Sequence, residues 1–484
     1  MLQIYNTLTR KKEELKAIKD KKIGMYVCGP TVYGPSHLGH ARTYIIFDFI
    51  RRFLEFSKYK VKFIMNITDI HDDILREAKR LKISPNQLAE KYSKEFFNDL
   101  ETLKIKKSLK NPRVSDSVKE IINLIKILIK KNCAYKTKDG VYFRISSLKN
   151  YGSLSGRKIE QTLTGTRVKT DKYEKEEATD FALWKITPPV AAPSGFVKLE
   201  HKEIPEEKTF DWVFDSPWGK GRPGWHIECS AMSKKYLGIP FDIHGGAIDL
   251  IFPHHENEIA QSESAFNKKL ANYFLHSGLL FVDGKKMSKS LKNFTTINEF
   301  LLKQQFTHSP RFLRFFIFSH HWRSVIDLNE KTLLDAFNNF VAINEFITKL
   351  KINGTRNKKQ ETNKIQTEFG ENFEYFKQKF IAFLEDDFNS ARAINYLLKF
   401  IKKVESQNEF NPELLKILKE FDKFFICFFP WTKIDSKTNE LIKQRETLRI
   451  ENKYNESDEI RNQLQKQGII LQDEKEKTLI VNLN

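Results

Sequence analysis

The sequence predicts an α/β protein, with a parallel-sheet domain split by an insertion, then a helical bundle, then a small mixed α/β tail. Three observations predict this class. Residues 22–80 read strand, loop, helix, strand, helix, which is a βαβ unit, and such units build parallel sheets. From residue 329 onward, apolar residues recur at helical spacing. Near the end, Gly468 separates a helical pattern from two short apolar runs, which predicts a small hairpin.

These patterns divide the 484 residues into five segments. We expect the first half of the sheet domain over 1–115, an inserted domain over 116–215, the second half over 216–328, the bundle over 329–430 and the tail over 431–484. In the tail we expect one helix over 441–465 before the hairpin. The stretch 188–215 is rich in proline and charge, and the sequence assigns it no role.

The first strand and the helix after it carry the first candidate site. The apolar run KIGMYV ends at Cys28, and glycines and prolines then interrupt regular structure until Ser36, which we expect to cap a helix. His37 and His40 then lie three residues apart in its first turn, on either side of Gly39. Helix N-termini attract anions, so two imidazoles there suit a polyphosphate. On spacing alone, packing or a metal pair is the commoner reading.

A second polar stretch follows some 250 residues later. Residues 286–290 read KMSKS directly after the apolar run GLLFV, and Lys286 and Lys289 are its two cations. A lysine-serine cluster is by itself usually a solvated loop. Asp249, in GGAIDL, is a candidate to bind hydroxyl groups, although a loop cap explains it equally well.

Four further residues have the chemistry of zinc ligands. His254 and Glu258 are four apart on a helix that we expect to begin at Pro253, so they share one face. Cys28 and Cys229 are 201 residues apart, and no CxxC is present. We expect both cysteines to follow strands at the carboxyl edge of the sheet. Two buried structural cysteines and a solvated acidic helix remain the alternative.

Composition restricts the class of protein. The net charge is +20, and residues 1–130 hold 27 Lys+Arg against 15 Asp+Glu, which favours a nucleic-acid partner or reflects a lysine-rich bias. Four scattered cysteines exclude a disulfide framework for so long a chain. No apolar run reaches 18 residues and the start has no secretory pattern, so we expect a cytosolic protein without a membrane segment. The absence of heptads favours a monomer.

The order HLGH early and KMSKS late resembles the class I aminoacyl-tRNA synthetases, whose catalytic domain is Rossmann-like. The stretches GRPGWHIECSAM and FDIHGGAIDLIFPHHENE are similar to those of the cysteinyl-tRNA synthetases. The resemblance is specific between residues 26 and 294 and weaker from 329. It implies a ligase that activates cysteine with ATP to cysteinyl-adenylate and transfers cysteine to the 3′-terminal adenosine of tRNA(Cys).

The resemblance also implies roles for single residues. His37, Gly39, His40, Lys286 and Lys289 would bind ATP, which enters with Mg²⁺, and the histidines and lysines would grip its phosphates. Asp249 would bind the ATP ribose, and Trp225 and His244 would lie near the cysteine substrate. One zinc ion per chain would be held by Cys28, Cys229, His254 and Glu258, with His255 as second choice for the histidine. The bundle would bind tRNA and the tail its anticodon end.

Two other functions remain open on the sequence. A ligase that joins cysteine to an amino sugar would share these motifs but would not need the bundle and tail. A paralogue that binds tRNA or zinc without catalysis is the second. Three positions depart from the family pattern: HLGH replaces HIGH, His71 stands where aspartate is usual, and Lys292 stands where glycine is usual.

Overall fold

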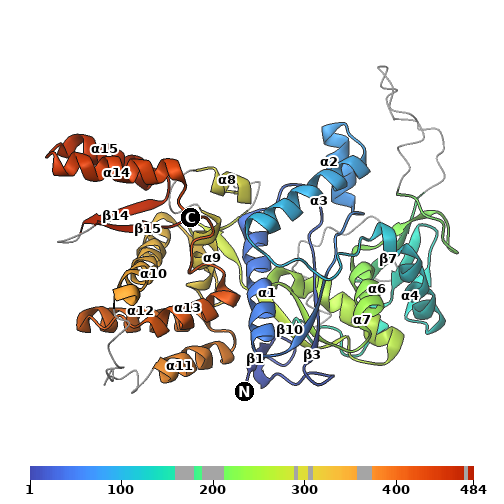
Figure 1. Ribbon diagram of the computed structural model, residues 1–484. Helices are drawn as coiled ribbons and strands as arrows, with labels where there is room; N and C mark the ends of the chain where they lie inside the picture. Colours follow the sequence, from blue (N-terminus) through green and yellow to red (C-terminus); the bar gives the residue numbers. More distant parts are fainter. Residues whose placement is uncertain (158–178, 188–211, 288–292, 304–308, 357–372, 474–477) are drawn as a thin grey trace.

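The computed structural model of the chain describes residues 1–157, 179–187, 212–287, 293–303, 309–356, 373–473 and 478–484 (Figure 1). The stretches between these ranges include most of 188–215, together with Lys289 and Lys292. Within the described ranges, no helix is both long enough and apolar enough to cross a membrane.

A four-stranded parallel sheet organises the first two thirds of the chain and confirms the α/β prediction. Its strands, in the spatial order β10-β9-β3-β4, are β10 (Ala271–Ser277), β9 (Phe241–Ala247), β3 (Lys22–Val27) and β4 (Lys60–Met65). Helix α1 (Leu38–Phe56) connects β3 to β4, and α7 (Glu256–Phe266) lies between β9 and β10. The two halves meet where β3 pairs with β9, and open α/β sheets bind ligands at such a junction.

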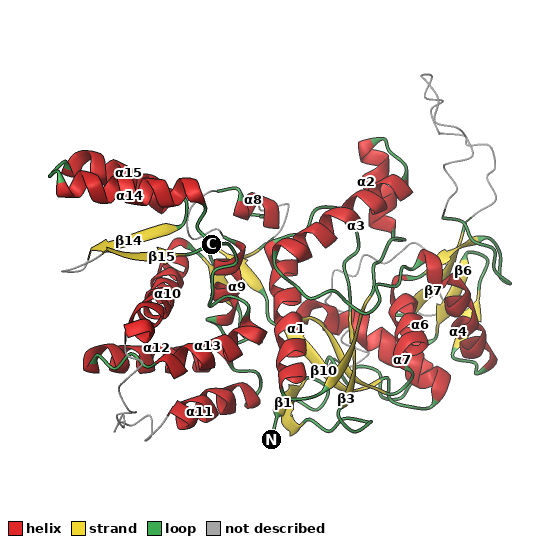
Figure 2. Ribbon diagram, viewed as in Figure 1, coloured by secondary structure: helices red, strands yellow, loops and turns green. Residues whose placement is uncertain are grey.

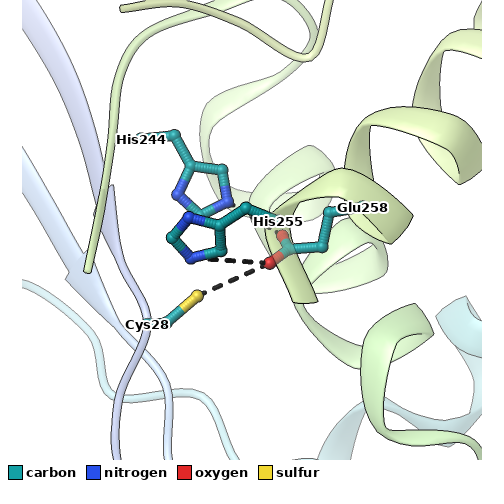
Figure 3. A group of neighbouring side chains, drawn as sticks. All are labelled: Cys28, His244, His255 and Glu258. Atoms are coloured by element: carbon teal, nitrogen blue, oxygen red, sulfur yellow. Dashed lines mark hydrogen bonds and ion pairs between the residues drawn. The ribbon is translucent and has the colours of Figure 1, made fainter. Parts of the chain in front are cut away.

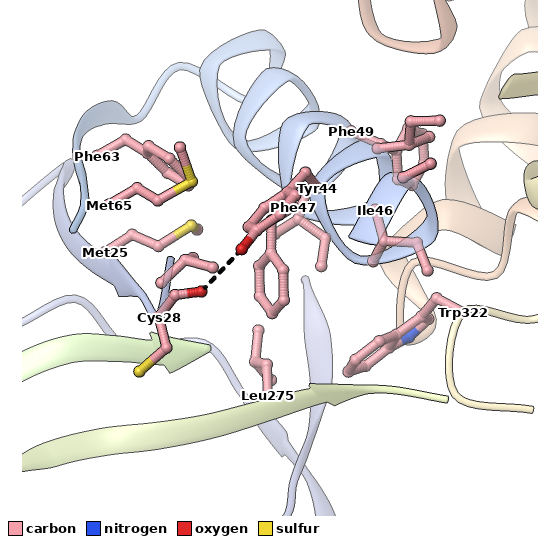
Figure 4. Packing of buried hydrophobic residues seen from close by; sticks show 14 of the residues in the cluster. Met25, Cys28, Tyr44, Ile46, Phe47, Phe49, Phe63, Met65, Leu275 and Trp322 are labelled. Carbon is pink, nitrogen blue, oxygen red and sulfur yellow. Dashed lines mark hydrogen bonds between the residues drawn. The ribbon is translucent and has the colours of Figure 1, made fainter. Parts of the chain in front are cut away.

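Helix α1 packs tightly on the sheet through an apolar stripe (Figure 4). Phe47 presses so closely on β9 that a Cβ added to Gly245 would lie 2.3 Å from its ring. The Tyr44 hydroxyl donates to the Cys28 carbonyl oxygen at 3.4 Å, beyond the end of β3. The helix that begins with HLGH is therefore fixed both to the sheet and to the loop that carries Cys28.

The insertion contains a separate antiparallel sheet. Its strands follow the order β5 (Ala134–Lys136), β6 (Gly140–Phe143), β7 (Phe181–Ile186) and β8 (Gly221–Pro223). Strand β8 lies past residue 215, so this sheet extends into the segment expected to begin the second half. Helices α2 (Asp72–Leu81) and α3 (Pro85–Thr102) precede it, and α4 (Val118–Lys130) packs against α6 (Trp225–Leu237).

The remaining elements of the first two thirds of the chain are short. A hairpin of β1 (Gln3–Asn6) and β2 (Lys11–Glu14) begins the chain. A three-stranded sheet follows β10, with β11 (Leu280–Val282) between β12 (Lys285–Lys286) and β13 (Ile326–Leu328). Helices α8 (Ile297–Leu301) and α9 (Pro310–Phe318) lie between β12 and β13 in the sequence.

The C-terminal helices confirm the bundle expected from the sequence (Figure 2). They are α10 (Glu330–Arg356), α11 (Phe373–Glu385), α12 (Ser390–Gln407) and α13 (Pro412–Phe425). The bundle shares its core with the sheet domain: the Phe49 ring of α1 lies 5.1 Å from Phe318 of α9 and 5.1 Å from Phe425 of α13. A single apolar cluster therefore runs from the parallel sheet into the bundle.

The tail corrects one prediction and confirms another. The single helix expected over 441–465 is wrong, because the chain reverses between α14 (Ser436–Ile450) and α15 (Tyr454–Lys466). Asn452 takes the left-handed conformation there, with φ 59°, which asparagine tolerates better than most residues. The hairpin is confirmed as β14 (Ile469–Asp473) paired antiparallel with β15 (Thr478–Asn482).

A buried ion pair joins α9 to α1. The Arg314 guanidinium donates to Asp48 Oδ2 at 2.8 Å and to the Phe425 carbonyl at 3.1 Å, and both charged side chains are fully buried. Arg314→Met should lower the free energy of unfolding by ~3 kcal/mol, because it leaves buried acceptors without a donor. Arg52→Met removes the partly exposed partner of Asp48, 2.9 Å away, and should cost ~1 kcal/mol or less. Urea unfolding followed by tryptophan fluorescence compares them, and equal losses would contradict the structural role of Arg314.

Candidate active site and metal centre

A cavity of about 420 Å³ opens at the carboxyl edge of the parallel sheet, where β3 and β9 meet. Its walls come from three distant parts of the sequence: the loop and helix after β3, the residues around α6 and β9, and the strands that lead to KMSKS. Most of the residues predicted for the site line it: Cys28, His37, Gly39, His40, Trp225, Cys229, Asp249, His254 and Lys286.

The two histidines of HLGH cap the helix themselves. His37 is the N-cap of α1, and its Nδ1 accepts from the Gly39 amide at 3.0 Å, while His40 Nδ1 accepts from the His37 amide at 3.3 Å. The prediction that Ser36 is the cap is therefore wrong by one residue, because imidazole nitrogens take the role usual for a hydroxyl. A neutral imidazole that accepts at Nδ1 carries its proton on Nε2, so each ring presents an N–H donor.

Burial favours the neutral form of the His40 imidazole. Desolvation, followed by the nearby His37, lowers the pKa of His40 well below its usual range. The two rings stack with their centroids 3.8 Å apart, and a Cβ on Gly39 would lie 2.8 Å from the His37 ring. Glycine is thus needed for the His37 side chain to fold back over the helix start.

Residues 294–297, a few positions after KMSKS in the sequence, lie against this helix start. The Leu38 amide donates to the Thr295 carbonyl at 3.2 Å, and the Ile297 amide donates to the Ser36 carbonyl at 3.0 Å. The Phe294 ring lies edge-on to His37, with centroids 5.1 Å apart. HLGH and the residues just after KMSKS are therefore joined by backbone hydrogen bonds.

Lys286 lies across the cavity mouth from Asp249, with Nζ 3.7 Å from Oδ2, and both side chains are about half exposed. The Met287 methyl group lies 3.6 Å from where a Cβ on Gly39 would stand. Lys289 and Lys292 lie outside the described residues, so the second lysine of the motif remains a prediction.

The four predicted zinc ligands come together at the cavity: Cys28, Cys229 and His254 line it, and Glu258 is fully buried beside them. The sulfur atoms of Cys28 and Cys229 are 3.7 Å apart, and Cys28 Sγ lies 3.6 Å from Glu258 Oε1. His254 Nε2 lies 3.1 Å from the same oxygen. All four ligand atoms are buried and lie within 4.8 Å of one another. Two sulfurs ~2.3 Å from a tetrahedral zinc stand ~3.8 Å apart, so the separation of the thiols fits that metal.

The elements that present these ligands differ in part from expectation. Cys28 follows β3 as predicted, but Cys229 lies in the second turn of α6 and not at a strand end. Helix α6 precedes β9 in a parallel sheet, so its first turns stand at the carboxyl edge that carries Cys28. Phe252 is extended, with φ −133° and ψ 130°, and the chain turns helical after it, which places His254 and Glu258 on one face.

The four ligand side chains strongly shift one another's pKa values. Burial alone would raise the pKa of Glu258, but His244 and His254 outweigh it and lower that pKa to about 2. Burial likewise opposes ionisation of Cys229, yet the Cys28 thiol and His254 lower its pKa to about 6. Burial and the neighbouring Cys229 raise the pKa of Cys28 well above the usual range. Burial opposes a charge on His254, but Glu258 and Cys229 outweigh it and raise the pKa of His254 to about 10. The His254 proton therefore balances one of the two anionic groups, and a metal bound here would displace that proton.

Two further histidines, His244 and His255, lie beside Glu258 (Figure 3). His244, expected near the substrate, is fully buried outside the cavity lining, with Nε2 2.9 Å from Glu258 Oε2. His255 Nε2 lies 4.0 Å from Glu258 Oε1, while its Nδ1 bonds to His276 Nε2 at 2.8 Å. Cys28, His244, His255 and Glu258 therefore form a second possible ligand group, although it contains one sulfur instead of two.

Sequence reasoning assigned no role to two histidines of the site. His226 Nδ1 lies 3.0 Å from His254 Nδ1, which orients the ring of the candidate ligand; its position three residues before Cys229 was the available signal. His71 caps α2 by accepting from the Asp73 amide at 3.1 Å, and its ring meets Trp225 edge-on at 5.6 Å. Trp225 in turn lies 4.4 Å from the His254 ring, between centroids.

Comparison with known proteins identifies the family. Residues 14–338 match the model of the tRNA synthetases class I (C) catalytic domain. The chain is 42% identical to a cysteine--tRNA ligase of Pyrococcus abyssi, over 99% of this chain and 98% of that protein. It is 40% identical to one of Brachyspira hyodysenteriae, over 97% of each.

Solved structures agree at the level of the fold. A methionyl-tRNA synthetase of Mycobacterium tuberculosis in complex with methionyl-adenylate superposes with a TM-score of 0.61 at 13% identity, covering 84% of this chain and 88% of that one. A putative arginyl-tRNA synthetase of Campylobacter jejuni gives 0.53 at 13% identity, covering 86% and 93%. The chain therefore belongs to the cysteine--tRNA ligase family of class I aminoacyl-tRNA synthetases.

Proposed function

We propose that this chain activates cysteine with ATP and charges tRNA(Cys), with zinc as the selective element for the substrate sulfur. One observation carries the proposal: two thiols and an imidazole on the wall of the cavity that holds HLGH and Lys286 converge with a buried carboxylate. A site for a soft sulfur ligand and a site for phosphates thus share one space. Activation of cysteine needs both, since the amino acid must meet the α-phosphate of ATP.

The residues of HLGH and KMSKS would act at the phosphate end. His37 and His40 present Nε2–H donors at the start of α1, where the helix also attracts anions. Lys286 also lines this cavity, and we propose that Lys289 binds the same phosphates. In-line attack of the cysteine carboxylate on the α-phosphate needs orientation and charge stabilisation, which these donors supply for the leaving pyrophosphate.

Cys28, Cys229, His254 and Glu258 would hold one zinc ion per chain. Bound there, zinc supplies a Lewis acid that favours a thiolate over a hydroxyl group, which distinguishes cysteine from serine. His244 and His226 fix Glu258 and His254 in orientation, at 2.9 and 3.0 Å respectively. Trp225 lines the cavity and packs against the His254 ring, with the ring centroids 4.4 Å apart.

Aminoacylation of purified tRNA(Cys) with labelled cysteine tests the function directly. We expect charging that requires ATP and cysteine, with serine far less effective. Cysteine-dependent ATP–pyrophosphate exchange without charging would favour the amino-sugar ligase, and absence of both would favour a binding protein. We also propose that the enzyme is a cytosolic monomer, which sedimentation of the purified chain tests for the oligomeric state.

Asp249→Asn should raise the KM for ATP ~10-fold with a smaller effect on kcat, because a neutral amide binds ribose hydroxyls less strongly than a carboxylate does. The position of Asp249 on the cavity lining supports this role. Asp283→Asn, in the turn between β11 and β12 and outside that lining, is the matched control. Steady-state exchange kinetics separates them, and an unchanged KM for Asp249→Asn would remove Asp249 from the nucleotide site.

A further inference from the structure

A second groove, of about 380 Å³, lies at the opposite end of the parallel sheet from the active site. It is formed by the amino ends of β3 and β4, the turn between α6 and β9, and the loop before β3. Its lining contains four lysines and one carboxylate: Lys19, Lys22, Lys60, Lys62 and Asp242. The proposed reaction uses none of these residues.

The positive charges of the groove lysines are not neutralised by acidic side chains of the described residues. Asp242 is buried, and its two carboxylate oxygens accept from the Ile18 and Gly24 amides, each at 2.7 Å. All four lysines are exposed. Among the described residues, no acidic side chain forms an ion pair with Lys19, Lys22 or Lys60. Lys62 Nζ donates to the Tyr236 carbonyl at 2.5 Å, in the last turn of α6, which keeps its ammonium group beside the groove.

The sheet register brings like charges together at a cost to the fold. Lys22 and Lys60 are direct partners across β3 and β4, and Gly24 pairs with Lys62. Because alternate residues of a strand share one face, Lys22, Lys60 and Lys62 lie on the same face. Opposed like charges destabilise a sheet, and an anion bound between them would remove that cost.

We propose that this groove binds the phosphate backbone of an RNA chain, as a second contact besides the tRNA site of the proposed function. Lysine binds phosphate as a point charge and needs no fixed geometry, and the lining offers four lysines for successive phosphates of one chain. Ile18 and Leu109, 43% and 60% exposed, add apolar surface for sugars or bases.

The groove lies at the amino edge of the sheet, on the far side from the cavity that would receive the tRNA 3′ end. Because the groove lies at the opposite edge of the sheet from that cavity, we assign the contact to a second RNA molecule. The groove also gives a location to part of the basic surplus of residues 1–130. A surplus that came from composition alone would not gather in one groove without acidic partners.

Binding of a fluorescent 12-nucleotide oligo(U) to the full chain, measured by anisotropy with tRNA(Cys) present at saturation, tests the proposal. The triple variant Lys22→Gln, Lys60→Gln and Lys62→Gln should weaken oligo(U) binding 10-fold or more. It should also reduce the slope of log K against log salt by ~2, since each phosphate that is no longer neutralised lowers the slope by ~0.7. The matched control replaces Lys119, Lys126 and Lys130, exposed on α4, by glutamine and should bind as the native chain does.

Activity measurements separate this proposal from the enzymatic one. The groove variant should keep native cysteine-dependent exchange and native charging, because none of its residues lines the active-site cavity. Failure of the native chain to charge tRNA(Cys) would disprove the enzymatic function, whereas the oligo(U) measurement would still test the groove. Native oligo(U) binding by the groove variant, or an equal weakening in the α4 control, would overturn the RNA contact. Displacement of oligo(U) by poly-glutamate at equal charge concentration would overturn it as well.

Discussion

Cys229→Ser should reduce zinc from one per chain to a small fraction and lower cysteine-dependent ATP–pyrophosphate exchange by ~10³-fold or more. The substitution removes one of two sulfurs that stand 3.7 Å apart, and a hydroxyl is a poor replacement for a thiolate ligand. ATP affinity should change little, because HLGH and Lys286 bind at the other end of the cavity. Elemental analysis beside exchange kinetics measures both effects.

Three matched variants make the result specific. Cys133→Ser, at the partly exposed cysteine after α4, should keep both metal and activity. His254→Ala should lose zinc and His255→Ala should retain it, since only the group with His254 contains both cysteines. The reverse outcome for the two histidines would assign the metal to the group that contains His244. Native protein that is fully active without metal would defeat the zinc proposal altogether.

Lys289→Ala should lower kcat for cysteine activation by ~10²–10³-fold, with a smaller change in the KM for cysteine. A cation that meets the pyrophosphate mainly in the transition state contributes to kcat and little to ground-state binding. Lys286 and Met287, the preceding residues of the motif, already line the cavity beside Gly39, which supports delivery of Lys289 to the phosphates.

Lys285→Ala is the control for this substitution. Lys285 is an exposed residue of the short strand β12, directly before the motif, and lies outside the cavity lining. Its replacement removes the same charge from the same segment and should leave kcat within about twofold of native. Pre-steady-state measurement of adenylate formation distinguishes the two variants. An unchanged rate of adenylate formation for Lys289→Ala would show that Lys289 has no catalytic role.

Much of the local structure around the site could be predicted from the sequence. Apolar periodicity located β3, α1 and the bundle helices, because burial imposes period two on strands and 3.6 on helices. Motifs indicated the two histidines at the start of α1 and the residue types of the metal cluster. The errors at Ser36 and at residues 441–465 were errors of boundary: a histidine nitrogen replaced the expected hydroxyl cap, and Asn452 permitted a reversal that helical periodicity does not reveal.

By itself, the sequence determined which residue types were available and in which order: two cysteines, the His254–Glu258 pair, HLGH and KMSKS. Only the tertiary structure decided their geometry. It placed Cys229 on a helix, set His244 behind Glu258, and joined HLGH to Thr295 by backbone hydrogen bonds. The reason is physical: periodicity and caps depend on neighbours a few residues away, whereas a sulfur–sulfur distance across 201 residues depends on how sheet, insertion and helices pack together.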